Sequence, residues 1–187
     1  MRYHYTDKEK KEILNNMTIL VDTREQENKH ILEFFNKKKI QYKNKKLDFG
    51  DYSFMLPPMP EYGITKPLMF DNEIVVERKG SLTELSGNLT EGRERFEKEL
   101  IRKQDAKFYL MVEDGSWEDI QSGCYNTKYN PVSFLATLNA YIARYRIDIQ
   151  FVTKYYAGTY IFALFNYHLR EVILNFDGQL GDLEEGE

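Results

Sequence analysis

The feature that most constrains the fold of this chain is the stretch Ile74-Val75-Val76-Glu77-Arg78-Lys79-Gly80. Three β-branched residues in a row are typical of a buried strand, and the charged residues that follow would lie where this strand opens into a loop. Charges in such a place are costly unless they are paired or hold a metal. Because side chains alternate along a strand, we expect Glu77 and Lys79 to share one face, with Arg78 on the other.

A second carboxylate is expected beside this pair. The segment from Asp48 to Met55 reads as a turn that feeds a strand, and Asp51 stands where that strand begins. If the two strands pair, Asp51 and Glu77 approach each other. Carboxylate oxygens hold Mg²⁺ while leaving water on it, and the metal makes such a water a better nucleophile toward a phosphodiester. A lysine at this place can orient or deprotonate the water, or neutralise the transition state.

Four ordered blocks resemble the XPF-type structure-specific endonucleases, a branch of the PD-(D/E)XK superfamily. Asp51 followed by Glu77-Arg78-Lys79 looks like the GD…ERK pattern of that family. Val21-Asp22-Thr23-Arg24-Glu25 resembles its VDxRE block, and Glu84 to Leu89 followed by Gly92-Arg93 resembles its helix and GR element. The blocks cover roughly residues 18–112 in the family's order. An isolated ERK triplet is common surface sequence, whereas four blocks in order form a specific signal.

The resemblance implies a fold, a reaction and a set of site residues. The fold would be α/β: a single domain with a restriction-endonuclease-like mixed β-sheet of about five or six strands, flanked by helices, with the site at one sheet edge. The reaction would be Mg²⁺- or Mn²⁺-dependent hydrolysis of DNA, in the family's substrate class of branched, flap or fork structures. The catalytic residues would be Asp51, Glu77, Lys79 and Arg78, and the metal ligands Asp22, Glu25, Asp51 and Glu77.

A basic window suggests where DNA would be contacted. From Lys29 to Phe49 the chain carries seven lysines against two acids, although its net charge is −4. Lys43, Lys45 and Lys46 lie on an expected strand within this window and are predicted to contact phosphate. The alternative reading is an edge strand that lysines protect from pairing. Arg93 matches the family's GR arginine and is a further predicted DNA contact.

The expected domain organisation follows from the length of the chain and from where its prolines and acidic residues gather. A length of 187 residues suits one compact domain. We expect a short helix or solvated arm over residues 1–16, a nuclease domain over 17–176 and an acidic tail over 177–187. Residues 56–72 hold four of the five prolines, which excludes a helix or a central strand and predicts an ordered loop or short hairpin. Residues 114–130 are expected to form a loop.

Several classes of protein are excluded by what the sequence lacks. The single cysteine, Cys124, cannot form an internal disulfide and is poor evidence for zinc. No GxxxxGK[ST] motif is present, so no nucleotide cofactor is expected. No apolar run reaches ~18 residues, and the first residues are too polar for a signal peptide. We therefore expect no membrane partner, and a cytoplasmic location, or a nuclear one in a cell with a nucleus.

The sequence allows two readings of the aromatic residues near the C-terminal end and two of the function. Aromatic residues are dense between positions 134 and 167; core packing explains them by default, but the resemblance implies a homodimer through residues 131–174. The alternative function is a non-catalytic DNA-binding or scaffold subunit on the same fold. Degenerate members of the family lose the carboxylates or the lysine, whereas this chain keeps Asp51, Glu77 and Lys79.

Overall fold

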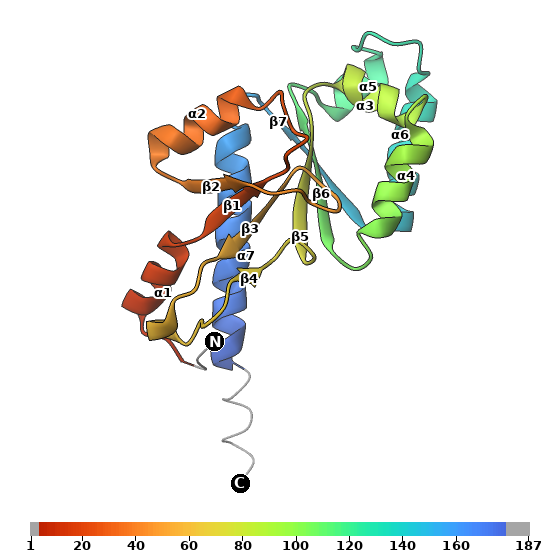
Figure 1. Ribbon diagram of the computed structural model, residues 1–187. Coiled ribbons are helices and arrows are strands. Elements are labelled where there is room, and N and C mark those ends of the chain that lie inside the picture. Colours follow the sequence, from red (N-terminus) through yellow and green to blue (C-terminus); the bar gives the residue numbers. More distant parts are fainter. Residues whose placement is uncertain (1–3, 179–187) are drawn as a thin grey trace.

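A mixed β-sheet runs through the centre of the molecule in the computed structural model, which describes residues 4–178 (Figure 1). Its strands follow the order β2-β1-β3-β5-β6-β7, and the short β4 pairs with β3. The strands are β1 Thr18–Val21, β2 Gln41–Asn44, β3 Tyr52–Leu56, β4 Leu68–Met69, β5 Ile74–Lys79, β6 Lys107–Glu113 and β7 Ile147–Val152. The predicted α/β class with a mixed sheet flanked by helices is confirmed.

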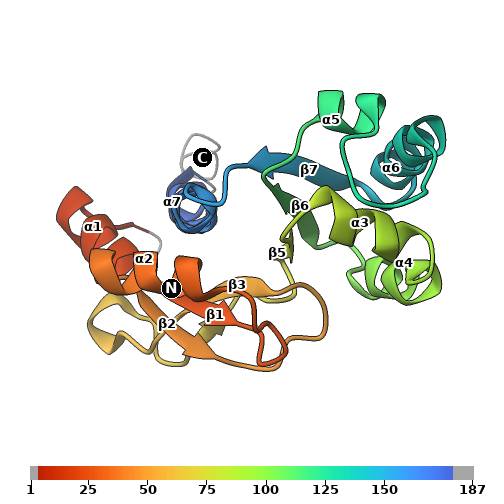
Figure 2. The ribbon, with the colours of Figure 1, turned by 90° about the horizontal axis from the view of Figure 1, so that it is seen from above.

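Helices cover both faces of the sheet. They are α1 Asp7–Asn15, α2 Lys29–Lys38, α3 Leu82–Leu89, α4 Arg93–Arg102, α5 Trp117–Ser122, α6 Pro131–Tyr145 and α7 Ala157–Gly178, with a 3₁₀ turn at Pro60–Tyr62. Figure 2 shows α1, α2 and α7 on one side of the sheet and α3 to α6 on the other. The alternation of β5 separates the two cores, because Ile74 and Val76 face the first group of helices and Val75 the second.

The directions of the strands decide which strand ends lie together. β1 is antiparallel to β3, which is antiparallel to β5, and β6 and β7 continue parallel to β5. The carboxyl ends of β1, β5, β6 and β7 therefore meet the amino end of β3 at one end of the sheet. β3 and β5 share one ladder pair, Tyr52 with Val76, so the two halves of the sheet are joined narrowly at its centre.

Local sequence signals account for most element boundaries. Thr6 caps α1 in a capping box with Glu9, Ser81 caps α3, and Asn130 precedes Pro131 at the start of α6. The proline-rich segment forms the 3₁₀ turn and β4 rather than a featureless loop, in line with the expected short hairpin. No helix among residues 4–178 is long and apolar enough to span a membrane.

One local prediction needs correction. Residues 114–130 are not all loop, because Ser116 accepts a hydrogen bond from the backbone of Asp119 and starts the short helix α5. Not every helix start has a side-chain cap, since Asn28 before α2 makes no capping hydrogen bond and is buried. The acidic tail beyond residue 178 lies outside the described residues.

Candidate active site

Glu77 and Lys79 form a buried ion pair at the carboxyl end of β5. Lys79 Nζ lies 2.6 Å from Glu77 Oε1, and both side chains face the α3–α4 side, where Lys79 also sits over the ring of Phe96. Burial alone lowers the pKa of Lys79, but the negative charges of Glu77 and Asp51 outweigh it and raise that pKa above its ordinary value. The lysine is therefore held as an ammonium in this arrangement.

Asp51 joins this pair from the start of β3. Its backbone connects three strands, because Asp51 N–H donates to Val76 and its carbonyl accepts from Asp22 N–H. Its carboxylate Oδ2 accepts the backbone N–H of Arg78 at 2.8 Å. Burial and then the charge of Glu25 raise the pKa of Asp51 to about 7. Burial and then the charge of Asp51 raise the pKa of Glu77 well above its ordinary value.

Arg78 points to the opposite face of the sheet, as the strand alternation predicts. Its guanidinium makes two hydrogen bonds of 2.8 Å to the carboxylate of Glu113 on β6 and one of 3.0 Å to Glu25. His30 on α2 also contacts Glu113 at 2.7 Å. Arg78 is almost fully buried, so this network fixes its charge inside the fold and turns it away from the Glu77–Lys79 pair.

Asp22 is engaged by an arginine and a backbone group. Arg24 binds it through Nε at 2.7 Å and Nη2 at 3.0 Å, and the N–H of Leu47 donates to Oδ2 at 2.6 Å. These hydrogen bonds lower the pKa of Asp22 even though burial alone would raise it. Both carboxylate oxygens thus have donors. Asp22 is thus paired with Arg24 and Glu25 with Arg78, while the charge of Glu25 still acts on Asp51.

Glu99 on α4 is an acid of this site that the sequence analysis left out. Its Oε1 accepts the N–H of Gly50 at 2.9 Å, and its charge contributes to raising the pKa of both Asp51 and Glu77. The sequence does not single out Glu99, because it is one of several acids that alternate with bases along the amphipathic helix α4. Glu113 and His30 were missed for the same kind of reason, since nothing in the sequence places either beside Arg78.

The site residues can be tested for their fit to a divalent metal. No group of three or more His, Cys, Asp or Glu side chains within the described part of the chain is arranged as a ready-made metal cage. Asp51 and Glu77, however, repel each other, and burial and then neighbouring acids raise the pKa values of both although the charge of Lys79 lowers them. A divalent cation would supply the missing charge, and Mg²⁺ is commonly held by one or two carboxylates and water. The donor set therefore fits a metal held by these two residues.

The site does not lie at a sheet edge as expected. β3 and β5 are the two central strands of the six-strand path, so Asp51 and Glu77 stand at the end of the two central strands. The reason is that two parallel strands, β6 and β7, add beyond β5, while β1 and β2 add beyond β3. The expectation failed because strand order cannot be read from the order of the blocks along the sequence.

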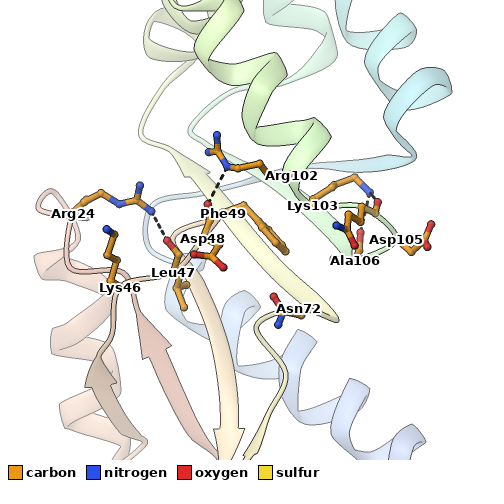
Figure 3. A pocket seen from close by; sticks show the side chains of 11 residues that line it. Arg24, Lys46, Leu47, Asp48, Phe49, Asn72, Arg102, Lys103, Asp105 and Ala106 are labelled. Atoms are coloured by element: carbon orange, nitrogen blue, oxygen red, sulfur yellow. Dashed lines mark hydrogen bonds between the residues drawn. The ribbon is translucent and has the colours of Figure 1, made fainter.

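The predicted DNA contacts are scattered. Arg93 is exposed and pairs with Glu97 at 3.0 Å, Lys45 pairs with Asp71, and Lys43 is exposed on β2. Lys46 lines a cavity of about 830 Å³, together with Asp48 and Phe49 of the segment that leads to Asp51 (Figure 3). Its walls come from the Arg24 turn, the segment before Gly50, the end of α4 and the turns preceding β5 and β6. These residues are Arg24, Lys46, Leu47, Asp48, Phe49, Asn72, Arg102, Lys103, Gln104, Asp105 and Ala106.

Comparisons with known proteins bear on the family and the fold. A family model described as the ERCC4 domain matches residues 21–164. A solved structure of XPF from Aeropyrum pernix is similar at 20% identity and a TM-score of 0.57, over 81% of this chain and 61% of that one. A complex of XPF from the same organism with DNA is similar at 20% identity and a TM-score of 0.59, over 82% and 66%. This chain thus spans less than two thirds of either protein. No curated protein matches the sequence.

Proposed function

The chain belongs to the ERCC4 domain family, and from that premise we propose that it is a divalent-metal-dependent endonuclease that hydrolyses phosphodiester bonds in DNA. The family consists of nucleases that depend on divalent metals. The observation that carries the proposal is the meeting of Asp51 and Glu77, two carboxylates with raised pKa values, beside the charged Lys79 at the end of the central strands.

Asp51 and Glu77 are the residues we propose as metal ligands, with Mg²⁺ or Mn²⁺ as the ion. When bound there, such an ion would stabilise negative charge on the phosphate and favour ionisation of an attacking water. Asp22 and Glu25 were predicted as further ligands. Because Arg24 and Arg78 hold them, we propose that they fix the positions of these arginines around the site instead.

Lys79 is proposed to act as a cation rather than as a base. Its raised pKa keeps the ammonium charged at neutral pH, and an ammonium can donate to an attacking water or to a phosphate oxygen that gains charge in the transition state. Arg78 is proposed to be a positioning residue. Its guanidinium binds the carboxylates of Glu113 and Glu25, and its backbone N–H donates to Asp51 and orients that carboxylate.

The finer substrate and the assembly are also proposals. Branched, flap or fork DNA is the substrate class that the resemblance implies, and one of the similar structures named above is a complex with DNA. A homodimer interface within residues 131–174 would involve either α6 or α7 and not both, since the two helices cover opposite faces of the sheet (Figure 2). We favour α7, where the exposed Tyr167 borders an apolar groove with Tyr109, Tyr160 and Leu164.

The test of catalysis uses the active-site pair. Purified protein with 5 mM Mg²⁺ or 1 mM Mn²⁺ is expected to cleave labelled flap or fork DNA, and excess EDTA should abolish cleavage. Glu77→Gln and Lys79→Ala should each lower the single-turnover rate by at least about 100-fold, the scale on which positioned acid–base and electrostatic groups contribute. Circular dichroism should show both variants folded.

A matched control removes an acid outside the site. Glu94→Gln on the exposed face of α4, whose carboxylate pairs with Lys98, should cleave at the unaltered rate. If Glu77→Gln cleaves as well as Glu94→Gln, the catalytic assignment is wrong. DNA binding without cleavage on any substrate would favour the non-catalytic DNA-binding or scaffold subunit.

A further inference from the structure

The cavity in Figure 3 lies where the two halves of the sheet separate. On one side, Leu47 belongs to a small apolar cluster with Leu20 and Met55 over β1 and β3. On the other, Phe49 and Ala106 belong to the larger cluster under α3 to α6. Because β3 and β5 share one ladder pair, no continuous layer of side chains bridges these clusters. The cavity is therefore a consequence of the sheet topology.

The charge of the cavity wall is opposite to that of the chain. Four of its lining residues are cationic, Arg24, Lys46, Arg102 and Lys103, against the two acids Asp48 and Asp105. The whole chain, by contrast, carries a net charge of −4. Lys103 is already used, because its buried ammonium donates to the carbonyls of Gln104 and Ala106. The three other cations remain to attract an anion into the cavity.

Two of these cations are held in place while keeping donors to spare. Arg24 uses Nε and Nη2 on Asp22 and the carbonyl of Leu47. Arg102 uses Nε on the carbonyl of Asp48 at 3.3 Å. Within residues 4–178, Arg24 Nη1, both Nη atoms of Arg102 and Lys46 Nζ have no hydrogen-bond partner. Guanidinium groups that are already positioned lose little conformational entropy when they bind a phosphate.

The cavity and the candidate active site are connected through residues adjacent in the chain and on α4. Asp48 and Phe49 line the cavity and lead through Gly50 directly to Asp51. Glu99, which accepts the Gly50 N–H, lies one helical turn before Arg102 on the same face of α4. A strand with its scissile phosphate at the Asp51–Glu77 pair would thus have a neighbouring segment within reach of this cavity.

We propose that this cavity binds the phosphodiester backbone of the DNA strand next to the scissile phosphate, through Arg24, Lys46 and Arg102. The proposal rests on the proposed function and deepens it by assigning the contact that positions the strand. The apolar floor of the cavity, Leu47 and Phe49, is buried and offers no exposed ring for base stacking. Binding there is therefore independent of base sequence, because phosphate contacts position a strand without reading it.

The test measures binding in EDTA, so that cleavage plays no part in it. A fluorescent single-stranded 20-mer, in two unrelated sequences, is titrated with the full chain at 50–200 mM NaCl, and anisotropy gives Kd. Lys46→Ala and Arg102→Ala should each weaken binding by about 3- to 10-fold for both sequences. Each should also reduce the slope of log Kd against log salt by roughly 0.7, the value for one phosphate contact on a single strand.

Lys98→Ala is the matched control. Lys98 is an exposed lysine of α4, the helix that carries Arg102, but it pairs with Glu94 and does not line the cavity, so its replacement should leave Kd and the salt slope unchanged. Equal losses in Lys98→Ala and Lys46→Ala would overturn the cavity in favour of a diffuse effect of surface charge. No detectable binding of the unaltered chain at 50 mM NaCl, or no change in either cavity variant, would also overturn it.

The outcome is separable from the proposed function. Lys46-dependent binding without metal-dependent cleavage would leave the cavity standing and remove the catalytic proposal. Metal-dependent cleavage with unaltered binding in both cavity variants would leave the catalytic proposal standing and remove the cavity. Titration with inorganic phosphate up to 20 mM distinguishes a strand from a free anion, because a site for the anion alone would release the oligonucleotide at low millimolar phosphate.

Discussion

Side chains at the end of β5 point to opposite faces of the sheet and make different contacts there. Glu77 and Lys79 face α4 and form a buried ion pair, while Arg78 faces α2 and joins Glu113 and Glu25. A bidentate arginine–carboxylate pair in a buried place is sensitive to the loss of either partner, because the remaining charge would be uncompensated. The ERK triplet thus places a buried ion pair on one face of β5 and an anchoring arginine on the other.

The Asp51–Glu77 pair makes a prediction at the scale of single residues. In metal-free protein at pH 8, Asp51→Asn should raise the free energy of unfolding by on the order of 1 kcal/mol, or roughly 2–4 °C in Tm for a domain of this size. It removes the repulsion with Glu77 and keeps an oxygen for the Arg78 N–H. Mn²⁺ should raise the Tm of the unaltered chain and not that of the variant, as differential scanning fluorimetry would show. A Mn²⁺ effect of the same size in both proteins would mean that Asp51 is not a ligand.

Elements differ in how firmly the sequence specifies them. The apolar run of β5, the serine before α3 and the Asn-Pro pair before α6 act locally, and each element begins where its signal stands. α7 packs its buried residues on the α1–α2 side of the sheet, and His168 on this helix contacts Phe54 and Phe70 edge to face. Burial and then the charge of Lys107 lower the pKa of His168.

His168 predicts how stability depends on pH. Its folded pKa lies below that of the unfolded chain, near 6.5, so as pH falls through about 6.5 the unfolded state takes up a proton first and stability is lost. Between pH 7.5 and 5.5 the loss from this half-buried group should be on the order of 0.5–1 kcal/mol. Urea unfolding across this range should show a smaller decline in the free energy of unfolding for His168→Phe than for the unaltered chain. An unchanged slope in His168→Phe would rule this source out.

The whole molecule combines a narrowly joined sheet with two separately covered faces. Of the ten aromatic residues between positions 134 and 167, three are buried, four pack partly buried against the core, and Tyr155, Tyr156 and Tyr167 are exposed. Val132 and Ile142 on α6 are exposed as well. Of the region expected to dimerise, the surface therefore offers two separate faces, one on α6 and one on α7.

The proposed homodimer can be tested by comparing these faces. Light scattering after size-exclusion chromatography at 10–200 µM should report twice the monomer mass. Tyr167→Ser should shift the equilibrium toward monomer by about tenfold, a change of ~1.4 kcal/mol. Val132→Ser on α6, which is 74% exposed, should not. A dimer weakened by Val132→Ser alone would place the interface on α6, and monomer throughout would exclude the dimer.

The sequence by itself determined what is local or strictly periodic: the fold class, the strands that carry Asp51 and Glu77, the opposite facing of Arg78, and the family. These follow from strand alternation, capping residues and blocks in fixed order, all of which are properties of neighbouring residues. The tertiary structure decided what depends on residues far apart in the chain. It placed the site at the middle of the sheet, paired Asp22 with Arg24 and Glu113 with Arg78, brought Glu99 to the site, and opened the basic cavity. Those outcomes depend on strand order and on which charged groups meet after packing, because the electrostatics of a buried carboxylate are set by neighbours that the sequence does not place.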